Sequence, residues 1–335
     1  MLLPAAFATG WLAFGTGTVW PARIVTTAHA IFGYGVLALV PWKQLIVRRG
    51  VVRAGGRRTL LIKAASILLA VSVIVSLAGG FAQSYAGTRT YFGLTAMQVH
   101  VGAALVATPL FLVHLFTRPQ RVRMTDLSRR NALRLGALLG VGAVAFAAAE
   151  GLAIVANLPG RRRRATGSYE RGTDDPANMP LVAWLFDEIP TIDISTYKVA
   201  VRAGGERRDV GYDELAQGTD TVRAVIDCTG GWYATQTWRG VRLDRLVPAP
   251  QSDQIQSGQV IVVTSATGYK RRFPAAEAKS LYLATHVAGE PLDDGHGAPA
   301  RLVAPGRRGF WWVKWVISIE LEDGYAWWQS PFPLQ

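Results

Sequence analysis

The side chain best suited to metal or redox chemistry occurs once in the 335-residue sequence, as Cys228. It follows the apolar run from Val222 to Ile226, which predicts a β-strand, and it precedes Gly230 and Gly231, which predict a turn open to a bulky ligand. A thiolate presented there would be a soft, strong metal ligand. A lone cysteine is also typical of a small buried hydrophobe, so Cys228 alone leaves both interpretations open.

Two further blocks follow in order, and they change that balance. They run from Gly289 through His296-Gly297-Ala298-Pro299-Ala300-Arg301 to Gly306, and from Gly309 to Trp315. Together with the stretch from Ile226 to Trp232, these blocks resemble the molybdopterin-dependent oxidoreductase fold shared by sulfite oxidases and periplasmic methionine sulfoxide reductases. With an entry segment near residues 178–190, the resemblance covers about residues 175 to 330.

The resemblance implies that Cys228 is the catalytic molybdenum ligand and that nearby residues bind Mo-molybdopterin. Arg301 and Lys314 are the first candidates to hold the pterin phosphate, which requires cationic and backbone donors. For each cation, the alternative interpretation is a solvated surface charge. The full set of cofactor-binding candidates is Asn178, Thr264, His296, Arg301, Arg307, Arg308, Trp312, Val313 and Lys314.

The residues after Cys228 also bear on the substrate. Sulfite oxidases place an arginine shortly after the metal cysteine to bind an oxyanion, whereas this sequence has Gly231, Trp232 and Tyr233. The resemblance therefore implies a neutral S-oxide or N-oxide as substrate. Arg239 or Arg242, in the next segment, would be the alternative source of positive charge.

The elements that carry these residues divide the chain by charge. Residues 1–164 contain 19 Lys or Arg and two acids, whereas residues 165–335 contain 17 Lys or Arg and 21 acids, which together give the net charge of +13. The basic residues of the first half separate apolar segments, as in the cytoplasmic loops of membrane proteins. This pattern argues against nucleic acid as a partner and for a lipid bilayer.

Five apolar segments are long enough to cross that bilayer, and buried helices of a soluble protein are the alternative. The predicted spans are Leu2 to Val19, Val25 to Val47, Ala64 to Ala82, Phe92 to Phe116, and Leu135 to Ala156.

The connections between the spans predict their orientation. The connection from Pro41 to Lys63 carries seven basic residues and the one from Thr117 to Arg134 carries six. The positive-inside rule makes both connections cytoplasmic. The expected location is therefore the cell membrane, with several spans and an extracytoplasmic C-terminal domain. Arg129 and Arg130, which precede the fifth span, also resemble a twin-arginine export motif, with an ordinary basic flank as the alternative.

Histidines within the spans suggest a second redox group. His29 and His100 are expected at one depth near the outer face, as bis-histidine ligation of a b-type haem iron requires. His114 lies 14 residues beyond His100, but the same step from His29 reaches Lys43, which disfavours a second haem. For His29 and His100, the alternative is hydrogen bonding between helices.

The sequence thus predicts a membrane α-helical bundle (1–156), a linker (157–177) and an α+β sulfite-oxidase-like domain (178–335). The predicted function is a molybdenum-cofactor oxidoreductase that exchanges electrons with the quinone pool through a membrane haem b and reduces an S-oxide or N-oxide. The alternatives are a sulfite-type dehydrogenase that runs in the oxidative direction and a non-catalytic binding module without metal.

Overall fold

The computed structural model describes residues 2–15, 19–52, 57–91, 93–117, 128–182, 188–247, 258–327 and 329. The chain forms two compact units. Unit 1 comprises Met1–Phe14 with Val19–Tyr169, and unit 2 comprises Gly15–Thr18 with Glu170–Gln335.

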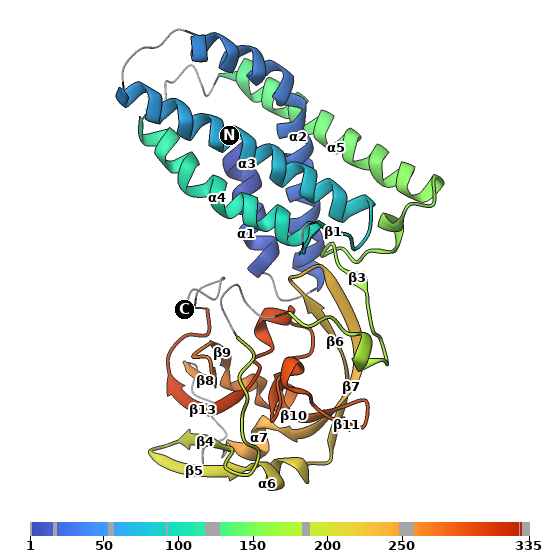
Figure 1. Cartoon of the computed structure of the whole chain (residues 1–335), viewed down its shortest axis with the longest axis vertical. Helices are drawn as coiled ribbons and strands as arrows, with labels where there is room; N and C mark the ends of the chain where they lie inside the picture. The colour runs from blue at the N-terminus through green and yellow to red at the C-terminus, as the bar shows by residue number, and fades with distance from the viewer. Residues whose placement is uncertain are drawn as a thin grey trace. The chain divides into compact units, whose positions relative to one another are not determined.

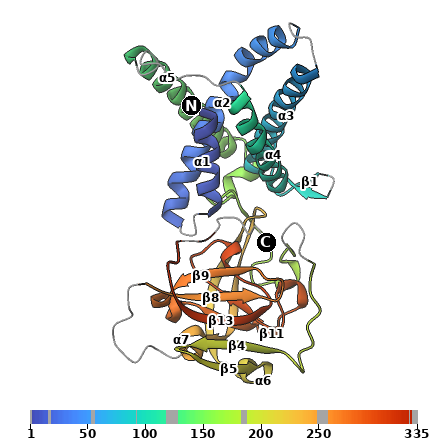
Figure 2. The same cartoon turned by 90° about the vertical axis from the view of Figure 1, so that its left-hand side faces the viewer.

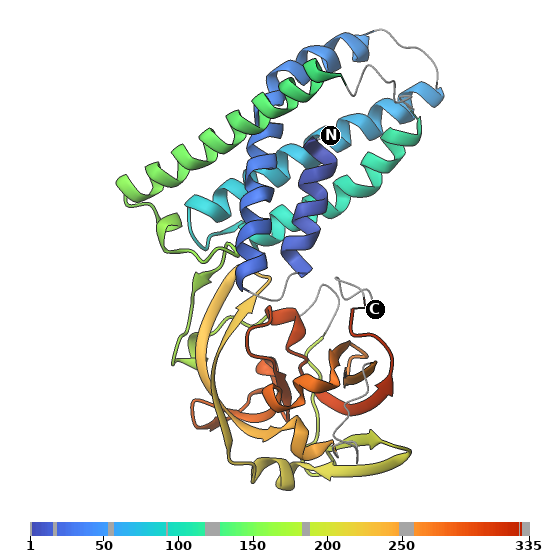
Figure 3. The same ribbon diagram turned by 180° about the vertical axis from the view of Figure 1, so that it is seen from behind.

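Unit 1 is built from long apolar helices (Figure 1). Helix α3 lies along α4, as the front and back views agree (Figures 1 and 3), and α2 packs against α5. Ser128 caps the start of α5, where its hydroxyl accepts a hydrogen bond from the Asn131 N–H. The helices are α1 (Leu2–Gly15), α2 (Val19–Val52), α3 (Arg57–Tyr85), α4 (Ala96–Thr117) and α5 (Arg129–Val155), with strands β1 (Thr90–Tyr91) and β2 (Leu94–Thr95) before α4.

Four of these helices are long and apolar enough to cross a membrane, over Pro21–Trp42, Leu60–Tyr85, Ala96–Thr117 and Arg129–Val155. The prediction of five spans is confirmed for these four only. Helix α1 has 14 residues, whereas a span requires about 20 residues at 1.5 Å of rise per residue. The predicted start of the fourth span, Phe92, lies outside the described residues.

The basic connections differ from simple loops. Much of the stretch between the second and third spans is helical, because α2 continues past the internal Pro41 to Val52 and α3 begins at Arg57. In the second basic connection, residues 118–127 lie outside the described part of the chain. Beyond α5, the predicted linker contains the short helix η2 (Pro159–Arg162), the strand β3 (Tyr169–Glu170) and the short helix η3 (Pro176–Asn178).

Unit 2 is an α+β structure, as predicted. Its strands are β4 (Lys198–Ala203), β5 (Glu206–Gly211), β6 (Asp220–Cys228), β7 (Trp232–Arg242), β8 (Gln259–Ser265), β9 (Lys270–Pro274), β10 (Tyr282–Val287), β11 (Glu290–Pro291), β12 (Arg301–Val303) and β13 (Val316–Asp323). Its short helices are α6 (Tyr212–Ala216), α7 (Leu243–Leu246), η4 (Ala275–Ser280), η5 (Asp294–His296) and η6 (Gly309–Trp311).

The strands form two sheets. One is five-stranded in the order β5-β4-β13-β8-β9, which Figure 2 shows side by side, and β13 pairs parallel with β4 and antiparallel with β8. In the other sheet, β10 pairs with β11, β12 and β7, and the long hairpin of β6 and β7 pairs Cys228 with Trp232 at its closed end.

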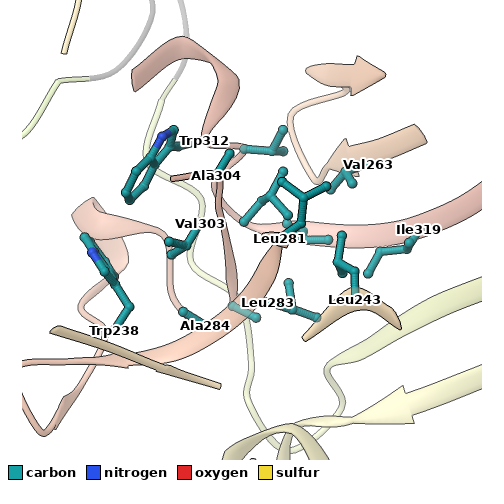
Figure 4. Packing of buried hydrophobic residues seen from close by; sticks show 14 of the residues in the cluster. Trp238, Leu243, Val263, Leu281, Leu283, Ala284, Val303, Ala304, Trp312 and Ile319 are labelled. Carbon is teal, nitrogen blue, oxygen red and sulfur yellow. The ribbon is translucent and has the colours of Figure 1, made fainter. Parts of the chain in front are cut away.

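The core of unit 2 joins side chains from both sheets (Figure 4). Leu283 of β10 and Ile319 of β13 are fully buried in it. Trp238 and Trp312 meet edge to face, with ring centroids 5.5 Å apart. Arg301 and Trp312, from the two blocks that follow Cys228 in the resemblance, are both buried in this part of the structure.

Candidate active site

Cys228 is the last residue of β6, and the turn that follows leads directly into β7. The Gly230 N–H donates a hydrogen bond to the Cys228 Sγ at 3.3 Å, and the Gly231 N–H donates to the Cys228 carbonyl at 3.1 Å. Gly231 has a φ of 91°, a left-handed conformation that favours glycine. The two glycines therefore turn the chain tightly and direct a backbone donor at the sulfur.

The segment before η6 passes directly beside this strand end. Asp227 and Arg308 form a parallel β-bridge, and the Arg308 Nε lies 3.7 Å from the Asp227 Oδ1. Both residues are 6% exposed, so this ion pair is buried next to the cysteine. A Cβ at Gly309 would lie 3.0 Å from the Cys228 Cα. Only a glycine fits this approach without displacing the backbone.

These neighbours determine the electrostatics of the thiol. Burial raises the pKa of Cys228, and the nearby Asp227 carboxylate acts in the same direction. The Gly230 N–H and the positive charges of Lys314 and Arg308 instead lower this pKa. The thiol is thus held protonated mainly by desolvation, while the surrounding cations stabilise its thiolate once the proton leaves.

Arg301 is a fully buried cation in this neighbourhood. Its guanidinium carbon lies 5.0 Å from the ring centroid of Trp238 and 5.7 Å from that of Trp312, and its NH1 group donates to the His296 carbonyl at 2.9 Å. Burial lowers the pKa of Arg301 to about 10, and the charges of Cys228 and Asp293 oppose this change. The buried Arg301 Nε has no hydrogen-bond partner among the described residues.

Lys314 is brought beside Arg301 by a close approach at Gly297. A Cβ at Gly297 would lie 3.1 Å from the Cβ atoms of both Arg301 and Lys314, and Gly297 has a φ of 109°. The Lys314 Nζ donates to the Gly295 carbonyl at 2.6 Å and to the Val182 carbonyl at 3.0 Å. Backbone carbonyls thus fix the position of this ammonium group.

His296 is held by partners on both ring nitrogens. Its Nδ1 lies 2.7 Å from the Asp293 Oδ2 and its Nε2 lies 3.2 Å from the Met179 carbonyl oxygen. Burial alone would raise the pKa of Asp293, but the hydrogen bonds from His296 hold it below its ordinary value. The imidazole therefore has a fixed orientation, and the backbone carbonyl of the same residue accepts the hydrogen bond from Arg301.

The other predicted site residues lie in different surroundings. Arg307 pairs with Glu277 at 2.7 Å, and the buried Trp312 donates from Nε1 to the Arg307 carbonyl at 3.2 Å. The buried Val313 accepts a backbone hydrogen bond from Leu302 at 2.7 Å. These contacts join the segment from Arg307 to Lys314 to β12, which carries Arg301.

Asn178 and Thr264 are not brought to this cluster by any contact that the structure describes. The exposed Asn178 donates its side-chain N–H to Asp175 at 2.6 Å. Thr264 lies within β8, where it pairs with Ser318 and Lys270 in the five-stranded sheet rather than in the sheet of Cys228. Arg239 and Arg242 are also engaged elsewhere, with the carbonyls of Ala216 and Gly218 and with Asp244, respectively.

The cluster fits an anionic, sulfur-rich metal cofactor. It offers one soft thiol, the buried cations Arg301 and Arg308, and a buried Nε on each of these that lacks a hydrogen bond within the described part of the chain. Among the described residues, no group of three or more His, Cys, Asp or Glu side chains could hold a metal ion.

In unit 1, His29 of α2 and His100 of α4 are in ring contact, with centroids 5.8 Å apart and planes inclined by 69°. The His29 Nδ1 lies 2.9 Å from the Ala6 carbonyl oxygen, and the His100 Nδ1 lies 2.7 Å from the Ser76 carbonyl oxygen. A carbonyl only accepts hydrogen bonds, so each neutral imidazole carries its proton on Nδ1 and keeps a lone pair on Nε2.

Comparison with known proteins gives matches to the part of the chain that contains this cluster. Residues 186–327 match the family model described as the oxidoreductase molybdopterin binding domain. Mitochondrial sulfite oxidase from Rattus norvegicus is 28% identical over 175 residues, which cover 42% of this chain and 32% of that protein. The protein-methionine-sulfoxide reductase catalytic subunit MsrP from Xanthomonas campestris pv. campestris is 27% identical over 175 residues, which cover 46% of this chain and 52% of that protein.

Among solved structures, the sulfane dehydrogenase SoxCD from Paracoccus pantotrophus aligns with a TM-score of 0.36 and 22% identity, over 40% of each chain. The chain spans about a third of the length of the sulfite oxidases and about half of the length of the reductases that it matches. Residues 186–327 of unit 2 thus match a molybdopterin-binding oxidoreductase domain, and this match supports the predicted cofactor class.

Several residues that build the cluster were not expected from the sequence. Trp238 covers Arg301, Asp293 orients His296, and Gly309 sets the distance between Arg308 and Cys228. Asp293 stands three residues before His296, a spacing typical of a helix cap, and this is the one signal that the sequence offers. The contact of Trp238 with Arg301 joins residues 63 positions apart and has no local signature.

Proposed function

We propose that this protein is a membrane-anchored molybdenum-cofactor oxidoreductase that exchanges electrons with the quinone pool through a haem b in unit 1 and reduces an S-oxide or N-oxide. The observation that carries the proposal is the position of the sole cysteine, Cys228. Its thiol lies within the electrostatic influence of Lys314, Arg308 and Arg301, which is the environment that an anionic metal cofactor requires.

Each residue of the cluster has a role in holding that cofactor. Cys228 would bind molybdenum as its thiolate, and Arg301 and Lys314 would bind the pterin phosphate. The bound cofactor supplies oxygen-atom and electron transfer at the metal. Trp238 and Trp312 exclude water from around the Arg301 guanidinium, and Asp293 keeps the His296 ring oriented.

The contact between His29 and His100 supports the haem. Both Nε2 lone pairs are available because both Nδ1 atoms donate to backbone carbonyls, the arrangement that usually orients metal-binding histidines. Small residues adjoin the rings, since a Cβ at Gly10 or Gly80 would lie 3.0 Å from His29 or His100. A Cβ at Gly33, about one turn beyond His29 on α2, would have no atom within 4 Å, which leaves space on that face of the helix.

The apolar helices support the membrane location, and the basic connections support its sidedness. With four spans, beginning at Pro21, both basic connections lie on one side of the membrane and unit 2 lies on the other. The five predicted spans give the same arrangement. The positive-inside rule makes the basic side cytoplasmic and unit 2 extracytoplasmic. A reporter that works only outside the cytoplasm, fused after Gln335, should then be active. The changes Arg129→Lys and Arg130→Lys should block export if the twin-arginine route is used.

Substrate reduction rests on the aromatic residues that follow Cys228, but Arg308 favours a second candidate. Its buried guanidinium lies beside the thiol and has an Nε without a hydrogen bond among the described residues. It could therefore bind an oxyanion in place of the arginine that sulfite oxidases carry after the cysteine. The second candidate function is a dehydrogenase that oxidises a sulfite-like anion and passes electrons to the quinone.

Metal and redox analysis of the detergent-purified chain tests the proposal. We expect molybdenum near one per chain, a pterin, and reoxidation of the reduced protein by methionine sulfoxide or trimethylamine N-oxide. Reduction of the protein by sulfite, without reoxidation by either oxide, would instead support the dehydrogenase. If the expressing cells make the cofactor but the purified protein holds no molybdenum, both enzyme functions would be contradicted. The non-catalytic binding module would then be the remaining interpretation.

A further inference from the structure

A hydrogen-bonded chain of side chains connects three membrane helices of unit 1. The Tyr34 hydroxyl of α2 lies 2.9 Å from the Tyr85 hydroxyl of α3, which donates to the Glu150 Oε1 of α5 at 2.9 Å. Because Tyr85 uses its one proton for Glu150, Tyr34 is the donor toward Tyr85. All hydroxyl donors of this chain thus point toward the carboxylate.

Arg163 closes the chain at its far end. It donates to the same Glu150 oxygen at 2.5 Å, and its guanidinium carbon lies 5.2 Å from the Tyr85 ring centroid. Glu150 is the only acid in the sequence of the four candidate spans. A charge within a membrane helix is costly and usually functional, so a carboxylate with ordered phenol donors calls for an explanation.

Along α3, the chain begins about one and a half helical turns from the residue that contacts the histidine pair. Gly80 of α3 contacts the His100 ring, and Tyr85 follows it by five residues on the same helix, a rise of about 7.5 Å. The Tyr34 ring packs against Phe81, with centroids 5.0 Å apart, and faces Phe146 at 6.2 Å. Tyr34, Phe81 and Phe146 are only half-buried, so a lipid-soluble aromatic ring can reach them from the bilayer.

We propose that Tyr34, Tyr85 and Glu150 form the proton-accepting side of a quinol oxidation site. The proposal rests on the proposed haem at His29 and His100, which is the one-electron acceptor. A quinol becomes a quinone by losing two electrons and two protons as both of its O–H bonds break. The haem that His29 and His100 would hold would accept the two electrons one at a time.

The protons leave in turn through the phenols. Tyr34 takes a proton from the quinol as its own proton moves to Tyr85 and that of Tyr85 moves to Glu150. Glu150 then releases its proton to water before the second one arrives, and the carboxylate that remains is paired with Arg163. In the oxidative direction, the same chain would deliver protons to a quinone.

The test uses the full-length chain in detergent, with decylubiquinol as the probe and haem absorbance as the signal. Glu150→Gln keeps the shape of the side chain but removes the proton acceptor, and Tyr85→Phe breaks the chain while leaving the Arg163–Glu150 pair intact. Each should slow quinol-dependent haem reduction by about 100-fold, the usual scale of a lost acid–base group. Tyr91→Phe, at an exposed tyrosine of β1, should not slow it.

Two further measurements separate this proposal from the haem itself. Both variants should keep the wild-type haem spectrum and its reduction by dithionite. Time-resolved infrared difference spectra after quinol addition should show a transient protonated carboxyl band in the wild type that Glu150→Gln lacks. Wild-type reduction rates in both variants would overturn the relay while leaving the haem. A wild-type protein without haem absorption would overturn the haem and the relay together.

Discussion

Gly309 lies so close to Cys228 that a Cβ at position 309 would stand 3.0 Å from the Cys228 Cα and 3.2 Å from the Asp227 carbonyl oxygen. This contact joins two segments that are 81 residues apart in the sequence. It positions Arg308, the residue before Gly309, against Asp227 at the end of β6. The shape of the site therefore depends on position 309 being a glycine, which has no side chain.

Gly309→Ala should displace the segment that carries Arg308, because backbone atoms cannot move aside as a flexible side chain can. We expect a loss of about 1–3 kcal/mol in the free energy of unfolding of unit 2, the usual cost of overpacking, together with lower cofactor content. Thermal unfolding and pterin content measure the two effects. Gly211→Ala is the matched control, since a Cβ there has no atom within 4 Å; equal effects of the two changes would contradict the argument.

Arg301→Ala should lower the cofactor content of the protein rather than the turnover rate of the molecules that keep the cofactor. The buried guanidinium carries an Nε without a hydrogen bond among the described residues, and a charge-assisted hydrogen bond to an anion contributes about 1.5–3 kcal/mol. The pterin content of the purified protein, read as fluorescence after oxidative release, should fall at least about tenfold. Arg202→Ala, at an exposed ion pair with Glu320, should retain the wild-type content. Full pterin content in Arg301→Ala would refute the assignment.

The thiol of the cofactor-free protein should react slowly at neutral pH. Burial raises the pKa of Cys228. At a given pH, the protein therefore contains less thiolate than an exposed cysteine, whose thiol has a pKa of about 8.5. Since the native state keeps the proton to higher pH than the unfolded state, the free energy of unfolding should fall as pH rises above that value.

The rate of alkylation against pH checks this, and the label is unambiguous because the sequence has one cysteine. Arg308→Gln removes a positive charge that lowers the pKa of Cys228, so its alkylation curve should shift to still higher pH. Arg202→Gln should not shift it. A midpoint below about 8.5 in the wild type would show that the cations outweigh burial.

The histidine pair predicts a specific spectral result. His29→Ala and His100→Ala should each abolish a low-spin b-type absorption spectrum, because each removes one of the two axial ligands. His114→Ala should leave the spectrum largely intact, since His114 lies 14 residues further along α4 and its Nδ1 is 3.4 Å from the Ser66 hydroxyl. Loss of the spectrum only in His114→Ala would place the haem at the inner face.

The sequence predicted the parts of the site that carry local motifs. The strand and glycine turn at Cys228 and the α+β class of unit 2 follow from short-range patterns, and the segments that contain Arg301 and Lys314 do meet. The proximity of Arg308 to Cys228 and the packing of Trp238 on Arg301 arise from tertiary contacts. Such contacts leave no periodic pattern in the sequence. The position of Thr264 was not predictable either, because a polar residue in a well-predicted strand gives no sign of which sheet that strand joins.

Unit 1 was predictable in its apolar helices and less so at their ends. The segment from Leu2 looked long enough to span, but its helix ends at Gly15, since composition marks apolar residues and not where a helix stops. Residues 157–177 were predicted to form a linker. Arg163 instead pairs with Glu150, a partner in the preceding helix that charge counting alone could not identify.

The central claim is that the Cys228 thiolate binds molybdenum, and Cys228→Ser tests it most directly. A serine oxygen is a harder ligand with a far higher pKa than a thiol, whereas Arg301 and Lys314 remain to hold the pterin. We therefore expect Cys228→Ser to keep much of its pterin and to lose turnover with methionine sulfoxide or trimethylamine N-oxide when reduced benzyl viologen is the electron donor. Wild-type turnover in Cys228→Ser would show that Cys228 is a buried structural residue and would contradict the molybdenum assignment.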